Sequence, residues 1–457
     1  MKDASPLYHC TKCDAQFSKW SGQCPECGAW STIIEGLSAE TNAERPVSSP
    51  NTRPGKTQPF ATLEGGSHEP RSATGLDLWD RILSGGFVRG SVTLLGGEPG
   101  IGKSTLLAQL ALIVAAQNKP VLYVTGEESP NQVYLRLKRL SPAIPSSFAF
   151  LDHTQADVIA ATIRETKPHL TIIDSVQTLK LPTVTGEAGN ATQVRASAAV
   201  IAEAAKQTGC SVVLVGQVTK EGELAGPRLL EHLVDTVLMM EGDRSQAFRL
   251  LRVVKHRFGT TEESSILTMG EQGLIEVLDP SAAFIGDRPK GTSGSVVSCL
   301  LQGARPLLIE LQALVTPAGF GVPSRRVTGA DANRLSLLLA VLGRRVGVGF
   351  GDQDVFVNAV GGVDAKDPSI DLAIALALAS AKSDKPFPPD MIAMGEVGLA
   401  GEIRPVARMA LRIKEAARLG FKTAIVPKEK ESPIVSGQTR MEIKPCATIR
   451  EAIQAAG

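Results

Sequence analysis

Length, composition and charge exclude several classes of protein: the chain has 457 residues, 43% hydrophobic and 21% charged, with a formal net charge of +1. It is too long for one ordinary domain, too apolar for a disordered chain, and too evenly charged to attract nucleic acid through a global field. No apolar stretch is long enough to span a bilayer and the N-terminus lacks the apolar core of a signal peptide, so we expect a cytoplasmic protein with no membrane segment.

Four cysteines near the N-terminus form two short knuckles. Cys10 and Cys13 make the first C-x₂-C pair, and Cys24 and Cys27 make the second. Two such knuckles can present four thiolates to one Zn²⁺ ion in tetrahedral geometry. Two redox pairs are the alternative, but no strand–helix–strand pattern surrounds these cysteines. We therefore expect a zinc ribbon, which is too short to fold through burial alone and depends on the metal for its folding energy.

The rest of the chain divides by composition and periodicity. Trp20 and Trp30 flank the second knuckle and are expected to form a small core beside the metal. The next stretch is rich in Ser, Thr, Pro and Asn, as flexible linkers are. Strand and helix patterns then alternate, which predicts a mostly parallel sheet covered by helices. The expected domains are a four-cysteine zinc finger at 1–35, a linker at 36–59, an ATPase domain at 60–279 and a C-terminal domain at 280–457.

The segment Gly96–Ser104 reads GGEPGIGKS and fits the phosphate-binding pattern G-x-x-x-x-G-K-[ST]. An apolar run suited to a buried strand precedes it at 92–95, and a helix-forming run follows at 105–116. The glycines let backbone N–H groups surround phosphate oxygens, while Lys103 adds a positive charge and the Ser104 hydroxyl ligates Mg²⁺. We expect ATP to bind here. The residues expected to hold it are Gly96, Gly97, Glu98, Pro99, Gly100, Ile101, Gly102, Lys103, Ser104, Thr105 and Asp174.

Polar side chains follow the strands expected in this domain. Ligands of such sheets bind at the carboxyl ends of the strands. We expect Asp174 to hold Mg²⁺ with Ser104, and Gln217 to sense the γ-phosphate unless it only caps its strand. Glu127 or Glu128 is expected to activate the attacking water; adjacent side chains on a strand point in opposite directions, so we favour Glu127 alone. The strands are expected at 120–125, 170–173, 211–216, 236–240 and 249–255.

Two cations stand one residue apart in the stretch KHRFG at 255–259. On an extended segment Lys255 and Arg257 face the same side. Such a pair can neutralise the charge that develops on the γ-phosphate of a neighbouring subunit, as arginine fingers do. A solvated basic loop is the alternative, and composition alone leaves the two interpretations about even.

These segments together resemble the bacterial RadA (Sms) family, relatives of RecA and of DnaB-type hexameric helicases. The matching parts are the four-cysteine finger, GGEPGIGKS, VTGEES, IIDS and KHRFG, in which His256 replaces the usual Asn. The resemblance implies a hexameric, DNA-dependent ATPase that drives branch migration of recombination intermediates in homologous recombination and DNA repair. It implies single-stranded and branched DNA and the RecA recombinase as partners.

The resemblance also assigns two loops to DNA. The loop at 176–193 is similar in position to the first DNA-contacting loop of RecA-like proteins, and the loop at 218–227 to the second. Lys220 is the only cation of the second loop, and Glu221 and Glu223 oppose it. A phosphate contact there is expected to be weak, because such contacts depend on cations.

The C-terminal third resembles the proteolytic domain of the Lon family, which uses a Ser–Lys dyad. Ser369, in Asp-Pro-Ser at 367–369, stands at the serine position. An ungapped comparison places Ala410 at the lysine position, with Lys414 one helical turn further on. Because a serine without an adjacent base is a poor nucleophile, we expect an inactive domain in which Ser369 caps a helix at 371–381.

The expected fold class is therefore a zinc ribbon, a RecA-like α/β P-loop core and a Lon-protease-like α+β domain. Two other functions remain open: an ATP-dependent Lon-type protease, and a switch ATPase of the KaiC type without DNA translocation. The last domain has basic residues that could follow a DNA backbone, although a solvated surface explains them nearly as well. These residues are Arg325, Arg326, Arg334, Arg344, Arg345, Lys366 and Lys382.

Overall fold

The computed structural model of the chain contains two compact units, residues 1–69 and 70–457. Cys13, Cys27, Lys366, the predicted linker and the loop at 218–227 lie outside the residues that it describes. The described residues are 8–10, 16–17, 19–26, 28–35, 71–217, 230–242, 248–286, 288, 291–303, 305–319, 322–360, 365, 367–428 and 441–457.

The first unit holds a small antiparallel sheet in the order β2-β1-β3. Its strands are β1 (Tyr8–Cys10), β2 (Gln16–Phe17) and β3 (Ile33–Glu35). Cys10, Cys24 and Ile33 are its buried core. Trp20 and Trp30 are 62% and 72% exposed, so the predicted tryptophan core is wrong. Among the described residues of this unit, Tyr8 and Phe17, and not the tryptophans, pack against the buried cysteines and Ile33.

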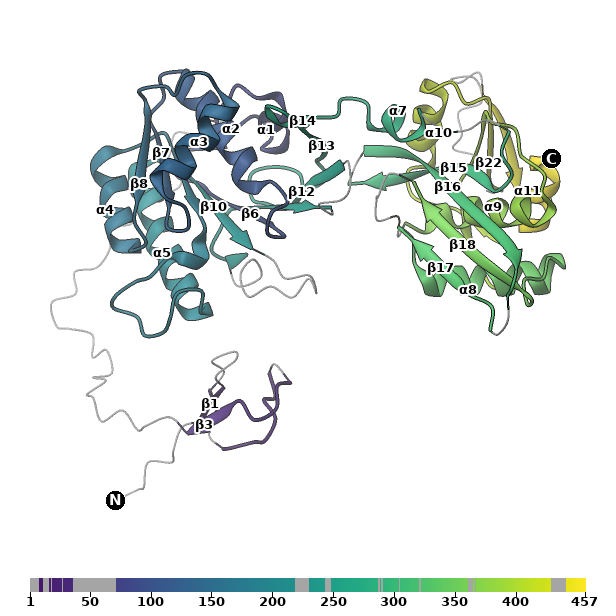
Figure 1. Cartoon of the computed structure of the whole chain (residues 1–457), viewed down its shortest axis with the longest axis horizontal. Helices are drawn as coiled ribbons and strands as arrows, with labels where there is room; N and C mark the ends of the chain where they lie inside the picture. Colours follow the sequence, from purple (N-terminus) through teal and green to yellow (C-terminus); the bar gives the residue numbers. More distant parts are fainter. Residues whose placement is uncertain are drawn as a thin grey trace, which may run out of the picture. The chain divides into compact units, whose positions relative to one another are not determined.

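The second unit begins with an α/β domain built on a nine-stranded sheet (Figure 1). A separate two-stranded sheet, β4 (Arg71–Ser72) and β5 (Phe87–Val88), precedes it in the chain. The sheet strands are β6 (Val92–Gly97), β7 (Val121–Thr125), β8 (Phe148–Asp152), β9 (Leu170–Asp174), β10 (Ser211–Gln217), β11 (Thr236–Glu241), β12 (Phe248–His256), β13 (Ser264–Gly270) and β14 (Gly273–Glu276). The helices are α1 (Asp77–Ile82), α2 (Lys103–Ala116), α3 (Pro130–Leu140), α4 (Ala156–Thr166), the short η2 (Val176–Thr178) and α5 (Ala191–Thr208).

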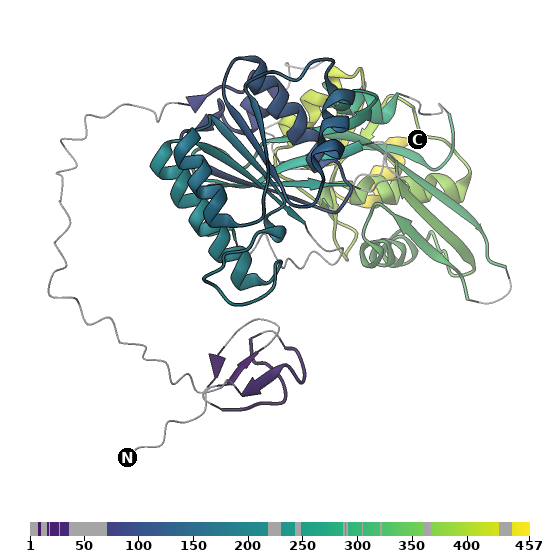
Figure 2. The ribbon, with the colours of Figure 1, turned by 60° about the vertical axis from the view of Figure 1, so that its left-hand side comes forward.

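The sheet order is β14-β13-β12-β11-β6-β10-β9-β7-β8. The six strands from β11 to β8 are parallel, and β12 to β14 extend the sheet as an antiparallel meander. Two apolar cores lie on its two faces: α1, α2 and α3 supply one, and α4 and α5 the other (Figures 1 and 2). Strands buried on both faces are continuous apolar runs, which is why the sequence shows them clearly. The strands expected from 92 to 255 are all present.

The C-terminal part of the unit is a seven-stranded mixed sheet with helices on both faces. Its order is β17-β18-β16-β15-β19-β22-β23, and β20 pairs with β21 separately. The strands are β15 (Ser295–Gln302), β16 (Arg305–Pro317), β17 (Arg325–Thr328), β18 (Gln353–Ala359), β19 (Met391–Ala393), β20 (Glu396–Val397), β21 (Ile403–Arg404), β22 (Thr423–Pro427) and β23 (Glu442–Cys446). The helices are α7 (Pro280–Ile285), α8 (Ala332–Val341), η3 (Leu342–Val346), η4 (Pro368–Ile370), α9 (Asp371–Ser383), α10 (Met409–Arg418) and α11 (Ile449–Ala456).

Among the described residues, no helix combines the length and the apolar character needed to cross a bilayer. The longest helix of the described ranges, α5, has 18 residues and carries Arg, Glu and Lys side chains. The apolar α9 has 13 residues and is enclosed by the C-terminal core.

Candidate nucleotide-binding site

The phosphate-binding loop joins the buried strand β6 to the buried helix α2. A Cβ atom at Gly97 would lie 2.6 Å from the carbonyl oxygen of Met240, so the backbone passes there only without a side chain. Gly102 precedes the helix with φ of 119°, a conformation that other residues rarely adopt. Arg249 of β12 donates from Nε to the carbonyl oxygen of Ile101 at 3.0 Å, which fixes the middle of the loop. The first N–H groups of α2 therefore face the loop, as in an anion-binding helix N-terminus.

Lys103 is the first residue of α2 and is only 5% exposed. Its Nζ donates to the carbonyl oxygens of Gly97, at 2.7 Å, and Glu98, at 2.8 Å. Burial lowers the pKa of Lys103, and the nearby carboxylates of Asp174, Glu127 and Glu98 oppose that shift. One ammonium among several carboxylates is the charge pattern that a phosphate chain and its divalent cation require.

Asp174 ends β9 and is buried. Its Oδ2 accepts a hydrogen bond of 3.1 Å from the hydroxyl of Tyr123, on the neighbouring strand β7. Ser104 lies half-buried in the first turn of α2. A buried carboxylate and a serine hydroxyl at the same sheet edge are hard oxygen ligands of the kind that Mg²⁺ prefers. These residues fit an Mg²⁺–nucleotide, although their roles stay a prediction.

Glu127 and Glu128 have different surroundings. The Glu127 carboxylate accepts from Ser175 Oγ at 2.5 Å and from Gln217 Nε2 at 3.4 Å. The Glu128 carboxylate is paired with Arg136 of α3. Glu127 therefore points toward the ends of β9 and β10, and Glu128 toward a helix, which favours Glu127 as the base. The sequence pattern did not single out Ser175, although its position directly after Asp174 was a usable signal.

Lys255 and Arg257 lie at the opposite ends of the strands from the phosphate-binding loop. β12 runs antiparallel to β11, and His256 pairs with Thr236 at the beginning of β11, whereas Met240 at the other end of β11 pairs with Gly97. The two cations are thus separated from the phosphate-binding loop of their own chain by the length of the strands. The structure brings Lys103, Asp174, Glu127 and Gln217 together and leaves the basic pair apart, as the strand pairings show.

Both cations contact the segment that leads into β11. Lys255 donates from Nζ to the carbonyl oxygens of Glu231 and Val234. Arg257, whose side chain is 51% exposed, pairs with Asp235 at 3.0 Å. The predicted common orientation is correct, because both side chains meet the same short segment. Asp235 also accepts from the backbone N–H of Val92, so it links the basic pair to the strand that carries the phosphate-binding loop.

Comparisons with known proteins decide the family. The chain is 46% identical to the DNA repair protein RadA of Pseudomonas aeruginosa over 451 residues, which cover 97% of this chain and 98% of that protein. It is 44% identical to DNA repair protein RadA of Bacillus subtilis, covering 93% of both, and of Aquifex aeolicus, covering 98% of both. The chain belongs to the RadA family.

Three family models match parts of this RadA-family chain. A rubredoxin metal binding domain matches residues 8–35, an AAA domain matches residues 79–223, and the ChlI subunit of Mg-chelatase matches residues 321–430. A solved structure of an ATPase domain aligns at a TM-score of 0.40 and 14% identity, covering 48% of this chain and 94% of that one. The predicted fold class is confirmed. The domain boundaries stay a prediction.

The ribbon of this RadA-family chain fits a metal. Cys10 and Cys24 come from different knuckles, and both are buried in one small core. Two sulfurs from separate knuckles must approach one another to ligate a single ion, and this shared core meets that condition. Zinc as the metal, and Cys13 and Cys27 as its other ligands, stay predictions.

The first predicted DNA loop, at 176–193, is held in place by hydrogen bonds and an ion pair between its own residues. Gln193 is buried, and its side chain bonds the backbone of Leu181, Val184 and Gly186. Lys180 is paired with Glu187. Backbone and hydroxyl groups therefore dominate this loop, and a DNA contact by it stays a prediction.

Ser369 in this RadA-family chain contacts an arginine. Its Oγ donates to the carbonyl oxygen of Cys299 at 3.1 Å and accepts from Arg412 at 2.7 Å. Ala410 is exposed, so its predicted place opposite the serine is wrong. The ungapped comparison placed the residue opposite Ser369 two positions too early, because α10 turns Arg412, and not Ala410, into the core. A guanidinium keeps its proton and cannot act as the base of a Ser–Lys dyad, which supports the expectation of an inactive domain; that expectation stays a prediction.

Ser369 is not the predicted helix cap either. The α9 helix has Ile370 at its N-cap and no side-chain cap, whereas Asp367 caps the preceding short helix η4, since its side chain accepts from the backbone N–H of Ser369 at 3.0 Å. The second carboxylate oxygen of Asp367 pairs with Arg412 at 2.8 Å. Burial alone raises the pKa of Asp367, but the bonds from Ser369 and Arg412 outweigh it, and the pKa lies below the ordinary value. Serine at 369 completes a buried polar cluster rather than a catalytic dyad.

Replacing Arg412 by methionine is expected to lower the free energy of unfolding by about 3–5 kcal/mol, because Asp367 is left without its buried partner. Scanning fluorimetry of the full chain measures the loss of thermal stability. The matched control is Arg404→Met, which removes an exposed arginine paired with Glu402. Since the pKa of Asp367 is depressed in the folded state, its contribution to the free energy of unfolding is present at neutral pH. This contribution is lost as the pH falls and the carboxylate is protonated. Equal effects of the two substitutions would contradict the role of the cluster.

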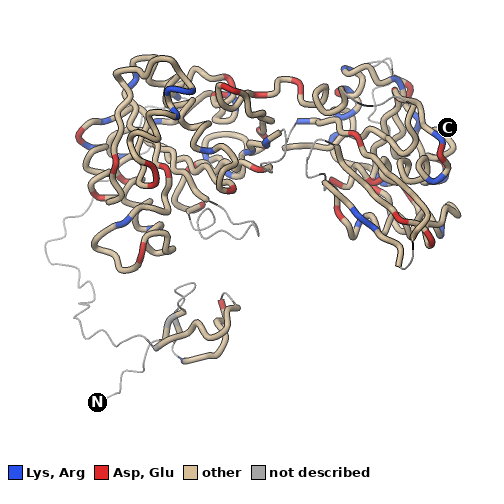
Figure 3. Tube along the Cα trace, viewed as in Figure 1, with Lys and Arg blue, Asp and Glu red and all other residues tan. Residues whose placement is uncertain are grey.

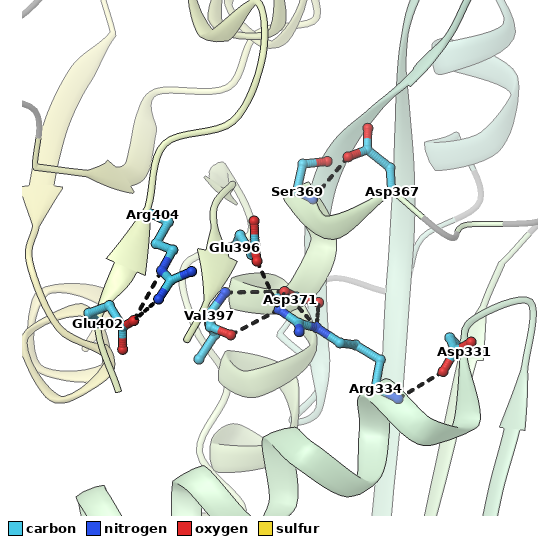
Figure 4. A network of polar contacts seen from close by, with 9 residues as sticks. All are labelled: Asp331, Arg334, Asp367, Ser369, Asp371, Glu396, Val397, Glu402 and Arg404. Carbon is cyan, nitrogen blue, oxygen red and sulfur yellow. Dashed lines mark hydrogen bonds and ion pairs between the residues drawn. The ribbon is translucent and has the colours of Figure 1, made fainter. Parts of the chain in front are cut away.

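The basic residues of the C-terminal sheet are not one surface. Arg334 binds the buried Asp371 in a bidentate pair and donates to the carbonyl oxygen of Val397 (Figure 4). Its guanidinium is therefore engaged, and the predicted use of Arg334 on DNA loses support. Lys382 donates to Gln353. Arg325, Arg326, Arg344 and Arg345 are exposed, but cations and carboxylates are mixed over the described residues (Figure 3).

Proposed function

We propose that this chain is a DNA-dependent ATPase that works as a ring-shaped, six-subunit motor in the cytoplasm. It drives branch migration of recombination intermediates in DNA repair, in concert with the RecA recombinase. Membership of the RadA family supports the role in DNA repair, and the AAA domain supports ATP hydrolysis. Ribbon residues Cys10, Cys13, Cys24 and Cys27 hold Zn²⁺.

The separation of the two charged groups carries the proposal. The cluster of Lys103, Asp174 and Glu127 lies at the carboxyl ends of the parallel strands, and the pair Lys255–Arg257 lies at their amino ends. Within one subunit the pair cannot reach the nucleotide. In a ring, subunits meet with the carboxyl edge of one sheet toward the opposite edge of the next, so the pair serves the neighbour's phosphates.

Each residue then has one task. The loop N–H groups and Lys103 bind the phosphates, and Ser104 with Asp174 hold Mg²⁺, which polarises the phosphoryl oxygens when bound. Glu127 accepts a proton from the attacking water, and the hydroxyl of Ser175 keeps its carboxylate in place. Gln217, bonded to Glu127, responds to the γ-phosphate and connects the site to the loop that follows it.

The test uses two single variants, Lys255→Ala and Arg257→Ala. Each variant is expected to bind nucleotide normally but to lose DNA-stimulated ATP turnover by about a thousandfold, because an arginine-finger-type cation contributes at least that much. Branch migration should be lost with it. The control is Arg252→Ala, which removes an exposed arginine from the same strand.

Full branch migration by Lys255→Ala would overturn the role of the pair. If wild-type turnover does not respond to single-stranded DNA at all, a switch ATPase replaces the motor. Casein cleavage that is lost in Ser369→Ala would instead establish a protease.

A further inference from the structure

The hydroxyl of Tyr123 is buried beside the carboxylate assigned to the metal. Tyr123 is the third residue of β7 and is 1% exposed. Its neighbours on the strand are apolar, and its ring stacks on Phe148 at a centroid distance of 6.1 Å. A phenylalanine would fill the same space, so the ring alone does not explain a tyrosine. A buried phenol needs a hydrogen-bond partner, and here the partner is Asp174 Oδ2 at 3.1 Å.

The direction of this hydrogen bond is fixed. Burial raises the pKa of Tyr123 well above the ordinary value, and the charge of Asp174 raises it further. The phenol O–H is therefore the donor and Asp174 Oδ2 the acceptor.

The bond also fixes the orientation of the carboxylate. Tyr123 pairs with Ile172 in the sheet, and Asp174 is two residues further along the same face of β9. The phenol thus approaches Asp174 diagonally from inside the core and occupies Oδ2. Oδ1 is left for the site at the sheet edge, where Ser104 and Lys103 begin α2. A carboxylate that is free to rotate about its Cβ–Cγ bond would lose entropy on binding a cation, whereas a held one has lost it already.

We propose that Tyr123 is a positioning residue for the divalent cation of the bound nucleotide: its hydroxyl holds the Asp174 carboxylate turned so that Oδ1 faces the metal. This inference rests on the proposed function, because it assumes that nucleotide and cation bind at the loop of Gly97–Ser104. Tyr123 acts through Asp174 and touches neither ATP nor the metal.

The test is Tyr123→Phe, which keeps the ring and its stacking. The probe is Mn²⁺, whose binding to the protein–ADP complex is followed by electron paramagnetic resonance. We expect the half-saturating Mn²⁺ concentration to rise about tenfold, the range for loss of a hydrogen bond to a charged group. Binding of ADP in the presence of EDTA should stay unchanged, because the phosphate-binding loop is intact. The control is Tyr134→Phe, which removes the hydroxyl of an exposed tyrosine of α3.

Unchanged Mn²⁺ binding by Tyr123→Phe would overturn the inference. Asp174→Asn, measured in parallel, separates the two levels of the proposal. If Asp174→Asn weakens Mn²⁺ binding and Tyr123→Phe does not, only the role of Tyr123 fails. If neither has an effect, the assignment of Asp174 in the proposed function fails as well.

A second measurement leaves Tyr123 in place, in case its substitution prevents folding. The chain has three tyrosines, so Tyr8→Phe with Tyr134→Phe leaves Tyr123 as the single phenol. Adding Mg²⁺ to this variant with ADP should change the ultraviolet difference absorption of Tyr123, because its acceptor carboxylate binds a cation. A spectrum that does not respond to saturating Mg²⁺ would contradict the link between phenol and metal.

Discussion

Replacing Glu127 by glutamine is expected to reduce ATP turnover by about a hundredfold or more while nucleotide still binds, because a general base contributes on that scale. The amide keeps the size of the side chain and can still bond Ser175 and Gln217, but it cannot take a proton from water. Single-turnover hydrolysis of ATP measures the chemical step, and equilibrium binding of a fluorescent ATP analogue measures affinity.

The neighbouring carboxylate provides the matched control. Glu128 is paired with Arg136 rather than with the residues at the strand ends, so Glu128→Gln should retain most of the turnover. The reverse pattern, in which Glu128→Gln is inactive and Glu127→Gln is active, would assign the base to Glu128. Arg136 would then control when the Glu128 carboxylate is free to act as the base, instead of holding it for structure alone.

Replacing Lys103 by alanine is expected to weaken ATP binding and to lower turnover by about a hundredfold or more, since one preorganised charge on the phosphates contributes at that level. The ammonium is buried and bonds the loop carbonyls, so the loss also loosens the loop itself. Branch migration should disappear in the same variant. Calorimetric titration with ATP, followed by a steady-state turnover assay, measures both effects.

Lys206→Ala is the control for Lys103, because it removes an exposed lysine from the helix α5. Thermal stability of both variants must be compared first, since Lys103 is part of the folded core. Wild-type turnover by a stable Lys103→Ala protein would mean that ATP is hydrolysed elsewhere in the chain.

The nucleotide site was the part that the sequence predicted best. Strands buried on both faces of a parallel sheet are continuous apolar runs, and the polar residue that ends each run marks one sheet edge. Lys103, Asp174 and Gln217 could therefore be placed together from the pattern alone. Strand alternation predicted that only one of Glu127 and Glu128 serves the site; both follow the end of β7 at Thr125, and the contacts of Ser175 and Arg136 support the preference for Glu127.

The predictions that failed depended on side-chain placement. Both ribbon tryptophans are exposed while Tyr8 and Phe17 pack against the core, and no periodicity in so short a segment distinguishes these aromatic residues. The orientation of α10 determines that Arg412, and not Ala410, contacts Ser369, and the ungapped sequence comparison missed this residue by two positions. Tyr123 was hidden because a tyrosine within an apolar strand looks like an ordinary core residue until its hydroxyl is seen at Asp174.

The central claim is that each nucleotide is shared by two copies of the chain, and mixing two inactive variants tests it most directly. Lys103→Ala lacks the phosphate lysine but keeps Arg257, and Arg257→Ala has the complementary defect. Mixed rings contain seams at which an intact loop meets an intact Arg257, so DNA-stimulated ATP turnover should return well above the sum of the two separate proteins. Mixed rings that assemble, as shown by mass photometry with ATP and DNA, and yet remain inactive would contradict the account.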